Sequence, residues 1–182
     1  MKKSIVLLLL FIGVPATLAQ SPPSSATAAG STEMKKIEFL VGNWKGTGWM
    51  QMGPGQRNET FVTESVQSKL GGRVFVIEGL GRARSDGNSE GRVVHNAFAF
   101  LFYDQESSRF RMRAFLANGQ SVDAETNYKD GVFEWSFQVP QGRIQYRIRL
   151  NEKQQWYEEG SITLDGGKSF QKFFEMTLDR TN

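Results

Sequence analysis

The chain of 182 residues contains no cysteine and a single histidine, His95. Neither a disulfide nor a lipid-modified cysteine is therefore available. Nucleophilic catalysis needs a hydroxyl or thiol next to a base, so His95 would have to be that base, and no Gly-x-Ser-x-Gly turn accompanies it. The carboxylate pairs that could act as acid and base are Glu64 with Glu78 and Glu158 with Glu159. Because glutamates on strands usually form a solvated face, the sequence predicts a protein that is not an enzyme.

Cysteine and histidine, the usual ligands of structural zinc, are nearly absent. A structural zinc site takes about four ligands at close spacing, mainly cysteine and histidine. One histidine and scattered carboxylates do not supply such a set, so we expect no metal and no cofactor. We interpret His95 as an ordinary structural histidine in the fourth strand, facing outward or toward the mouth of the fold.

Long apolar runs are absent beyond the N-terminal segment. There, two lysines precede the apolar run Ile5 to Val14, which is followed by Pro15 and by small residues up to Ala19. This order is typical of a signal peptide. The run is about half of the roughly 20 apolar residues that span a bilayer. We expect cleavage near Ala19, a secreted or periplasmic protein that starts at Gln20, and no stable membrane anchor.

Charge of one sign is not in excess either. Removing Lys2 and Lys3 with residues 1–19 lowers the basic count from 22 to 20 against 19 acidic residues, a net charge of +1. Nucleic-acid binding calls for a clustered basic face, so we expect no nucleic-acid partner. Residues 20–32, which are rich in Pro, Ser and Ala, indicate a disordered linker. The remaining residues 33–182 have the usual size of one domain.

The chain does contain a regular series of strand and turn signals. Residues 33–41 have apolar residues three apart and predict a short helix that ends at Gly42. Beyond it the apolar period is two, and turn-formers such as Asn118-Gly119 recur at even spacing. Short turns without intervening helices predict an all-β antiparallel up-and-down meander, and closure into a barrel removes its edges. A two-sheet sandwich is the alternative. The ten expected strands are 43–52, 58–69, 73–84, 92–103, 109–117, 120–127, 132–138, 142–150, 155–164 and 169–179.

Two hairpins allow a prediction of register. Pairing Phe102 with Phe110 places the phenylalanines of the fourth strand inside the barrel and the arginines of the fifth strand outside. Pairing Ile148 with Glu158 directs Glu158 into the barrel together with apolar neighbours. A carboxylate inside a barrel needs a hydrogen-bond partner, water or a ligand.

The stretch LVGNWKGTGW, residues 40–49, combines three glycines with two tryptophans. Glycine lets a strand bend strongly where side chains would crowd its neighbours, so this stretch fits the first strand of a tightly coiled barrel. Its segment Gly42-Asn43-Trp44 resembles the opening Gly-x-Trp of the lipocalin and fatty-acid-binding superfamily. In that superfamily the tryptophan packs at the closed end of the barrel under a late arginine, which implies that Trp44 stacks on Arg180.

A closer resemblance rests on three short motifs, FLVGNWKGTG, FYDQESSRF and the closing FEMTLDR. Together they resemble a bacterial lipocalin-like family known only as a domain of unknown function, which is related to the nitrobindin-type haem barrels. The resemblance implies a lipocalin-like barrel over residues 33–180. Nitrobindin-type barrels hold haem iron through a histidine near the chain end, and residues 169–182 contain none. A haem site would therefore have to use His95.

These observations predict a non-catalytic barrel that binds a small hydrophobic or amphipathic molecule. Its lining is expected to combine aromatic and apolar side chains with one carboxylate that orients the polar end of the ligand. The expected lining residues are Phe98, Phe100, Met112, Trp135, Tyr146, Trp156 and Glu158. Two alternatives stay open. One is a filled barrel that acts as a structural or interaction domain, for example as a homodimer joined across the apolar fourth strand. The other is a haem-binding barrel.

Overall fold

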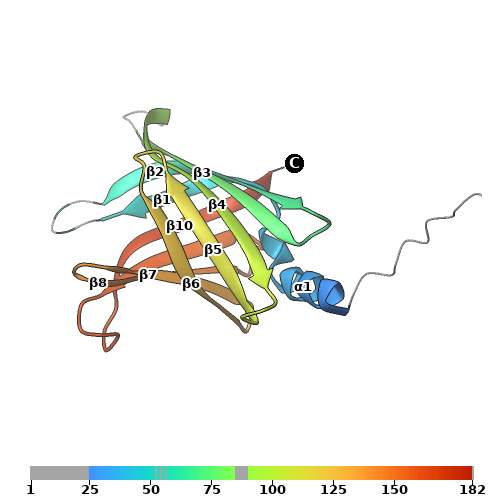
Figure 1. The fold of residues 1–182 in the computed structure, drawn as a ribbon. Coiled ribbons are helices and arrows are strands. Elements are labelled where there is room, and N and C mark those ends of the chain that lie inside the picture. Colours follow the sequence, from blue (N-terminus) through green and yellow to red (C-terminus); the bar gives the residue numbers. More distant parts are fainter. Residues whose placement is uncertain (1–24, 52, 54, 56, 85–89, 182) are drawn as a thin grey trace, which may run out of the picture.

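Ten strands close into one barrel in which each strand is antiparallel to both neighbours (Figure 1). The computed structural model describes residues 25–181 except 52, 54, 56 and 85–89. Around the barrel the order is β1-β10-β9-β8-β7-β6-β5-β4-β3-β2, so β1 closes the ring between β2 and β10. The elements are α1 (Ser25–Lys36), η1 (Glu38–Leu40), β1 (Gly42–Met50), β2 (Asn58–Lys69), β3 (Val74–Arg84), β4 (Glu90–Asp104), β5 (Arg109–Leu116), β6 (Ser121–Lys129), β7 (Val132–Val139), β8 (Gly142–Leu150), β9 (Trp156–Thr163) and β10 (Gln171–Thr181). The expected ten-stranded antiparallel barrel is confirmed.

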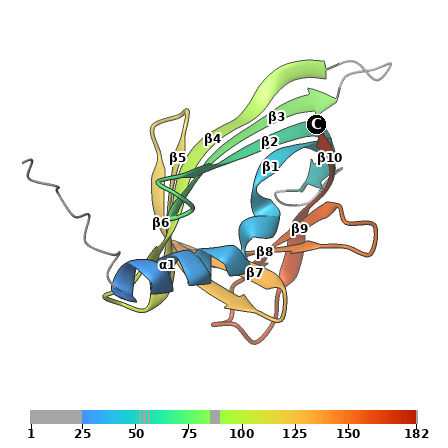
Figure 2. The ribbon, with the colours of Figure 1, turned by 90° about the vertical axis from the view of Figure 1, so that its right-hand side faces the viewer.

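The N-terminal segment covers one end of the barrel (Figure 2). Met34, Ile37 and Leu40 are at most 1% exposed, because their three-residue spacing turns one apolar side of α1 and η1 toward the barrel. α1 begins at Ser25, earlier than the helix expected from residue 33, and so covers residues that the sequence assigned to the linker. The alanines of that segment favour a helix although they lack an apolar period. No described helix is long and apolar enough to cross a membrane, and the expected signal peptide, residues 1–19, lies outside the described residues.

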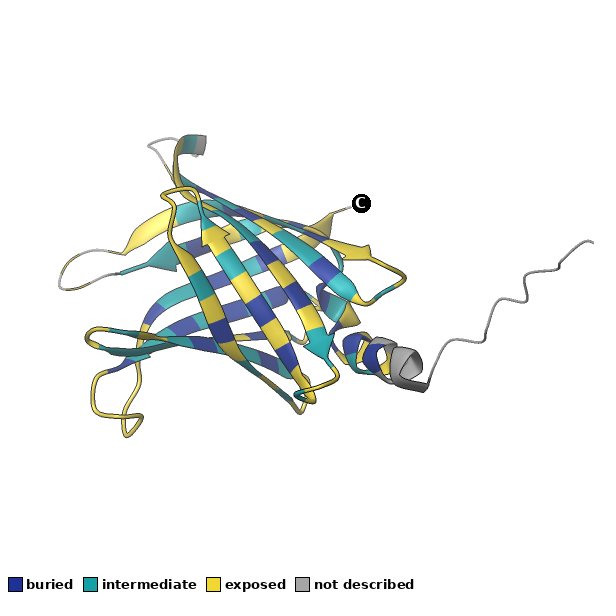
Figure 3. Cartoon of the chain, viewed as in Figure 1, coloured by how far each residue is buried: buried dark blue, intermediate teal, exposed yellow. Residues whose placement is uncertain are grey.

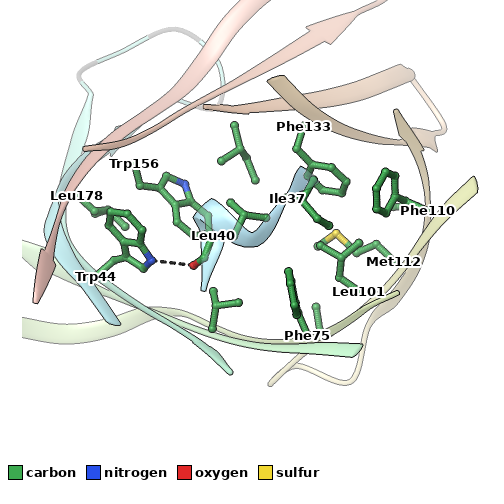
Figure 4. Packing of buried hydrophobic residues seen from close by; sticks show 14 of the residues in the cluster. Ile37, Leu40, Trp44, Phe75, Leu101, Phe110, Met112, Phe133, Trp156 and Leu178 are labelled. Atoms are coloured by element: carbon green, nitrogen blue, oxygen red, sulfur yellow. Dashed lines mark hydrogen bonds between the residues drawn. The ribbon is translucent and has the colours of Figure 1, made fainter. Parts of the chain in front are cut away.

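The two ends of the barrel differ. Because the strands alternate in direction, the β2–β3, β4–β5, β6–β7 and β8–β9 turns lie at the α1 end, which we call the closed end. Inward-facing side chains farther along the strands keep intermediate exposure, and the alternation of buried and more exposed positions along each strand is visible in Figure 3. The opposite end is therefore the mouth. The buried cluster at the closed end (Figure 4) includes Ile37, Leu40, Trp44, Phe75, Leu101, Phe110, Phe133 and Leu178.

The register of β4 differs from the prediction by one residue. Tyr103, instead of Phe102, pairs with Phe110, so the alternate phenylalanines of β4 point outward. Phe100 is 39% and Phe102 is 38% exposed, whereas the intervening side chains face the core. The prediction that Phe98 and Phe100 line an interior cavity is therefore wrong.

The physical reason is that β4 is apolar on both faces, so alternation along this strand alone does not define its register. The pairing with β5 fixes the register of β4, because the arginines of β5 face solvent while Phe110 and Met112 face inward. The inner face of β4 is then formed partly by the small Ala97 and Ala99. The other predicted pair, Ile148 with Glu158, is present.

Candidate functional site in the barrel interior

The floor of the interior is built around Trp44. Its indole Nε1 donates a hydrogen bond to the carbonyl oxygen of Leu40 at 2.9 Å (Figure 4). The guanidinium carbon of Arg180 lies 4.1 Å from the centroid of the Trp44 ring. The stacking that the lipocalin resemblance implies is thus present in the structure, at the closed end.

Arg180 also connects the last strand to the segment before the first. Its guanidinium donates hydrogen bonds to the carbonyl of Phe39 at 2.9 Å and to the carbonyl of Val41. A Cβ atom at position 42 would collide with this guanidinium, and Gly42 has a φ of 137°, where side chains are disfavoured. Gly42 and Arg180 therefore belong to the closure of the barrel, together with Trp44.

Glu158 projects from β9 into the barrel above this floor and is 6% exposed. Its Oε2 accepts a hydrogen bond from Nε1 of Trp156 at 3.1 Å, and the indole of Trp135 also donates to the carboxyl group. Burial raises the pKa of Glu158 to about 7, and the two indole hydrogen bonds oppose this rise. The carboxyl group can therefore gain or lose a proton near neutral pH.

Glu64 is a second carboxyl group inside the barrel, contrary to the expectation that glutamates on strands form a solvated face. It alternates with the buried Val62 and Val66 along β2 and so points inward. Burial, with a further contribution from the negative charge of Glu158, raises the pKa of Glu64 well above its ordinary value. The signal was present in the sequence, since the pattern V-x-E-x-V places the glutamate in phase with two valines.

Glu64 is only partly enclosed by protein. Burial raises the pKa of its carboxyl group, yet the residue keeps intermediate exposure and lines an open hollow at β1–β4. Among the described residues, no donor forms a hydrogen bond with this carboxyl group. Gly79 is its partner across the β2–β3 ladder, and a Cβ atom there would approach Glu64 Oε1 to 2.7 Å. The glycine therefore provides the room that the carboxyl group occupies.

Trp135 and Tyr146 form an aromatic wall beside Glu158. Their rings stack with centroids 4.2 Å apart and planes 11° from parallel, and both residues keep intermediate exposure. A Cβ atom on Gly160 would lie 2.8 Å from the Tyr146 ring, so this glycine makes room for it. Burial, with the nearby charge of Glu158, raises the pKa of Tyr146, so its phenol stays protonated at physiological pH.

The structure brings together some, but not all, of the predicted lining residues. Met112 points inward but packs in the closed-end cluster, where it is 9% exposed. Phe98 and Phe100 contact each other on the outer face, with ring centroids 4.9 Å apart. The four that share one region of the interior are Trp135, Tyr146, Trp156 and Glu158.

His95 lies near the mouth, where it pairs with Gly81 across the β3–β4 ladder. The residue is exposed, and partial desolvation of its ring lowers its pKa. Within the part of the chain that the structure describes, no three His, Asp or Glu side chains are grouped so that they could hold a metal ion.

A hollow of about 460 Å³ is present at β1–β4 and is wide open to solvent. Its lining comes mainly from outward side chains, including Asn43, Lys45, Thr63, Glu78 and Asn96, and it also includes Glu64 and Gly79 of the inner face. The hollow is wide open to solvent, so by itself it lacks the enclosure of a usual small-molecule site. Because Glu64 belongs both to this lining and to the inner face that carries Glu158, we take the inner face around Glu64 and Glu158 as the candidate site.

Comparison with known proteins supports the fold. No family model matches the chain, and no curated protein matches it. Rv2717c from M. tuberculosis superposes with a TM-score of 0.58 at 13% identity, over 82% of this chain and 97% of that one. The S-type phycobiliprotein lyase CPES from Guillardia theta superposes with a TM-score of 0.56 at 15% identity, over 88% of this chain and 99% of that one. The protein therefore has a ten-stranded barrel of the lipocalin-like kind.

Proposed function

We propose that the barrel binds a small hydrophobic or amphipathic molecule in its interior, which enters through the mouth. The observation that carries this proposal is Glu64, a carboxyl group inside the barrel without a hydrogen-bond donor among the described residues. Leaving a polar group without such a partner in an apolar interior costs about 1–3 kcal/mol. A filled structural barrel would favour an apolar residue at this position, whereas a bound ligand or water supplies the missing partner.

The surroundings of Glu64 and Glu158 support the same function. Small-molecule sites usually combine apolar and aromatic walls with a few convergent polar groups. Here the stacked Trp135 and Tyr146 stand beside Glu158 and keep intermediate exposure. This composition suits a ligand with an apolar body and one polar end.

The structural neighbours bear on this proposal through the fold alone. Both are barrels of similar size, and one is named a phycobiliprotein lyase. A name shared at 15% identity does not carry an activity to this chain. We assign binding to the interior and no reaction to its residues.

Ligand binding can be tested on the mature protein purified from its own source without denaturation. Native mass spectrometry should show the protein mass plus that of one small molecule, which is released by organic solvent. The emptied protein should then bind the neutral fluorescent dye N-phenyl-1-naphthylamine. A bare protein that also fails to bind the dye would contradict the proposal.

Two adjacent residues of β4 offer a matched pair of variants for this test. Ala97 faces inward, where it pairs with Gly79, and Phe98 faces outward. Ala97→Trp should fill the interior space and reduce dye binding, whereas Phe98→Trp should leave it unchanged. Equal effects of the two variants would place the dye outside the barrel.

We also propose that the protein is secreted or periplasmic, from the signal-peptide pattern of residues 1–19. The intact mass of the exported protein should correspond to a chain that starts at Gln20. A mass that retains Lys2 and Lys3 would contradict this localisation.

A second candidate function is self-association through the outer face of β4 and β5. Phe100 and Phe115 contact each other there, with ring centroids 6.5 Å apart, and they are 39% and 36% exposed. Apolar side chains gathered on one outer face favour burial against a second copy of the chain. A dimer in native mass spectrometry that Phe100→Ser disrupts, but Leu164→Ser does not, would support it; Leu164 is the control because it is 65% exposed in the β9–β10 turn.

A further inference from the structure

Two carboxyl groups project into the barrel, whereas a site for the carboxylate of a fatty acid would be expected to carry a basic side chain. Glu64 and Glu158 both lie inside the barrel, and the charge of Glu158 acts on Glu64. Among the described residues no cationic side chain pairs with either carboxyl group. The guanidinium of Arg180 is held at the closed end by Trp44 and by main-chain carbonyls.

We propose that Glu64 and Glu158 receive a cationic amine, so that the barrel selects amphipathic amines over carboxylates with the same chain. This inference rests on the proposed function and names the ligand class of that same site.

Charge balance is the first argument. Two carboxyl groups that share a space of low dielectric repel each other when both are ionised. A carboxylate ligand would add a third acid to this space. Apart from Arg180, the basic side chain on the inner face of the described strands is His95, which lies near the mouth and has a lowered pKa. An ammonium group compensates the charge that the two glutamates carry and gives the Glu64 oxygens the donor that they lack.

The aromatic side chains beside Glu158 provide the second argument. Tryptophan and tyrosine faces attract cations, and ammonium ligands are commonly held by such rings. Trp135, Tyr146 and Trp156 lie in this region, and both indoles direct their N–H groups at the Glu158 carboxyl. The same rings that orient the carboxyl group can therefore contact an ammonium and the first carbons of its chain.

A stretch of the inner side of β1, which lies between the strands of Glu64 and Glu158, carries no side chains because β10 packs closely against it. Between Trp44 and Met50 the inner face of β1 consists of Gly46 and Gly48, since alternate residues of a strand face the same side. Gly48 pairs with Met176 of β10, which pairs in turn with Glu158. No β1 side chain therefore occupies the inner surface at this level.

The test compares three ligands with one chain length: dodecylamine, dodecanol and sodium dodecanoate. Each ligand competes with N-phenyl-1-naphthylamine for binding to the mature protein. All three are used below the concentrations at which they aggregate, at a pH where dodecylamine is protonated. Dodecylamine is expected to displace the dye at a concentration about tenfold or more below that needed for either other ligand. The variants are Glu64→Gln and Glu158→Gln, and the control is Glu152→Gln, whose side chain is exposed in the β8–β9 turn.

Each outcome has a distinct meaning. Loss of the amine preference in Glu64→Gln or Glu158→Gln, with unchanged binding of dodecanol and an unchanged Glu152→Gln protein, supports the inference. Equal displacement by all three ligands, or a preference for dodecanoate in the unaltered protein, overturns the amine inference and leaves the proposed function standing. Failure of the unaltered protein to bind the dye and all three ligands overturns both. The comparison of ligands needs no variant, so a variant that does not fold still leaves a decisive result.

Discussion

The guanidinium of Arg180 covers the ring of Trp44 at 4.1 Å from the ring centroid. The two residues stand on β10 and β1 and are direct partners in the ladder that closes the barrel. Since Arg180 also donates to the carbonyls of Phe39 and Val41, one side chain joins the closing ladder to the N-terminal segment. The closure of the sheet and the covering of its end are therefore parts of one arrangement.

Replacing Arg180 with Met should destabilise the protein by about 2 kcal/mol, because charged hydrogen bonds to main-chain carbonyls and a cation–π contact are lost together. Urea unfolding followed by tryptophan fluorescence measures this change. Arg149→Met is the matched control, since Arg149 stacks on Tyr157 at 4.6 Å without a role in the closure. Equal losses in both variants would show that the Arg180 contacts contribute no more than a surface stack.

Two inner-face glycines should respond differently to alanine. A Cβ atom at Gly46 would collide with the main-chain oxygen of Thr177, which cannot move without disturbing the β1–β10 ladder. At Gly79 the obstacle is the flexible carboxyl end of Glu64. Gly46→Ala should therefore lower the melting temperature markedly, whereas Gly79→Ala should leave a folded protein with weaker ligand binding. Similar melting temperatures for the two variants would contradict this.

The strand boundaries could be predicted because glycine-containing turns recur between segments of period two, and each such segment buries one face. The inward direction of Glu158 could be predicted as well, since the β8–β9 hairpin has clear alternation on both strands. The placement of Trp44 against Arg180 came from a resemblance, because two residues so far apart in sequence share no local pattern.

The errors have a common physical origin. In β4 both faces are apolar, so the alternation of its phenylalanines does not show which face points into the barrel. Only the pairing with β5 shows that Phe100 lies outside. Glu64 was missed because a single glutamate is more often solvated, although its valine neighbours face inward. Local propensity also extends α1 to Ser25 without an apolar period.

Glu158 should make stability depend on pH. Its pKa is raised from 4.5 in the unfolded reference to about 7 in the fold, so the folded state binds the proton more tightly. Stability contributed by this group is present below pH 4.5 and is lost as the pH rises through 7. The loss is about 3 kcal/mol for a shift of this size. The negative charge of Glu158 in turn raises the pKa values of Glu64 and Tyr146.

Glu158→Gln removes that titration. The difference in unfolding free energy between this variant and the unaltered protein should shift in favour of the variant as the pH rises from 4.5 to 8. Urea unfolding at several pH values measures it, because titrations common to both proteins cancel in the difference. A difference that stays constant over this range would contradict the placement of an ionisable group with a raised pKa at this position.

The neighbouring residues Leu101 and Phe102 give the most direct test of the β4 register. Leu101 is fully buried and faces the closed-end cluster, whereas Phe102 is 38% exposed on the outer face. Leu101→Ala should therefore cost about 2–5 kcal/mol, since it leaves a cavity in a packed core. Phe102→Ala should cost about 1 kcal/mol or less, because its ring is partly in water already. Denaturant unfolding of the two variants under identical conditions measures both values. The reverse order would mean that the phenylalanines of β4 face inward, and the interior around Glu64 and Glu158 would then be filled by aromatic rings instead of open to a ligand.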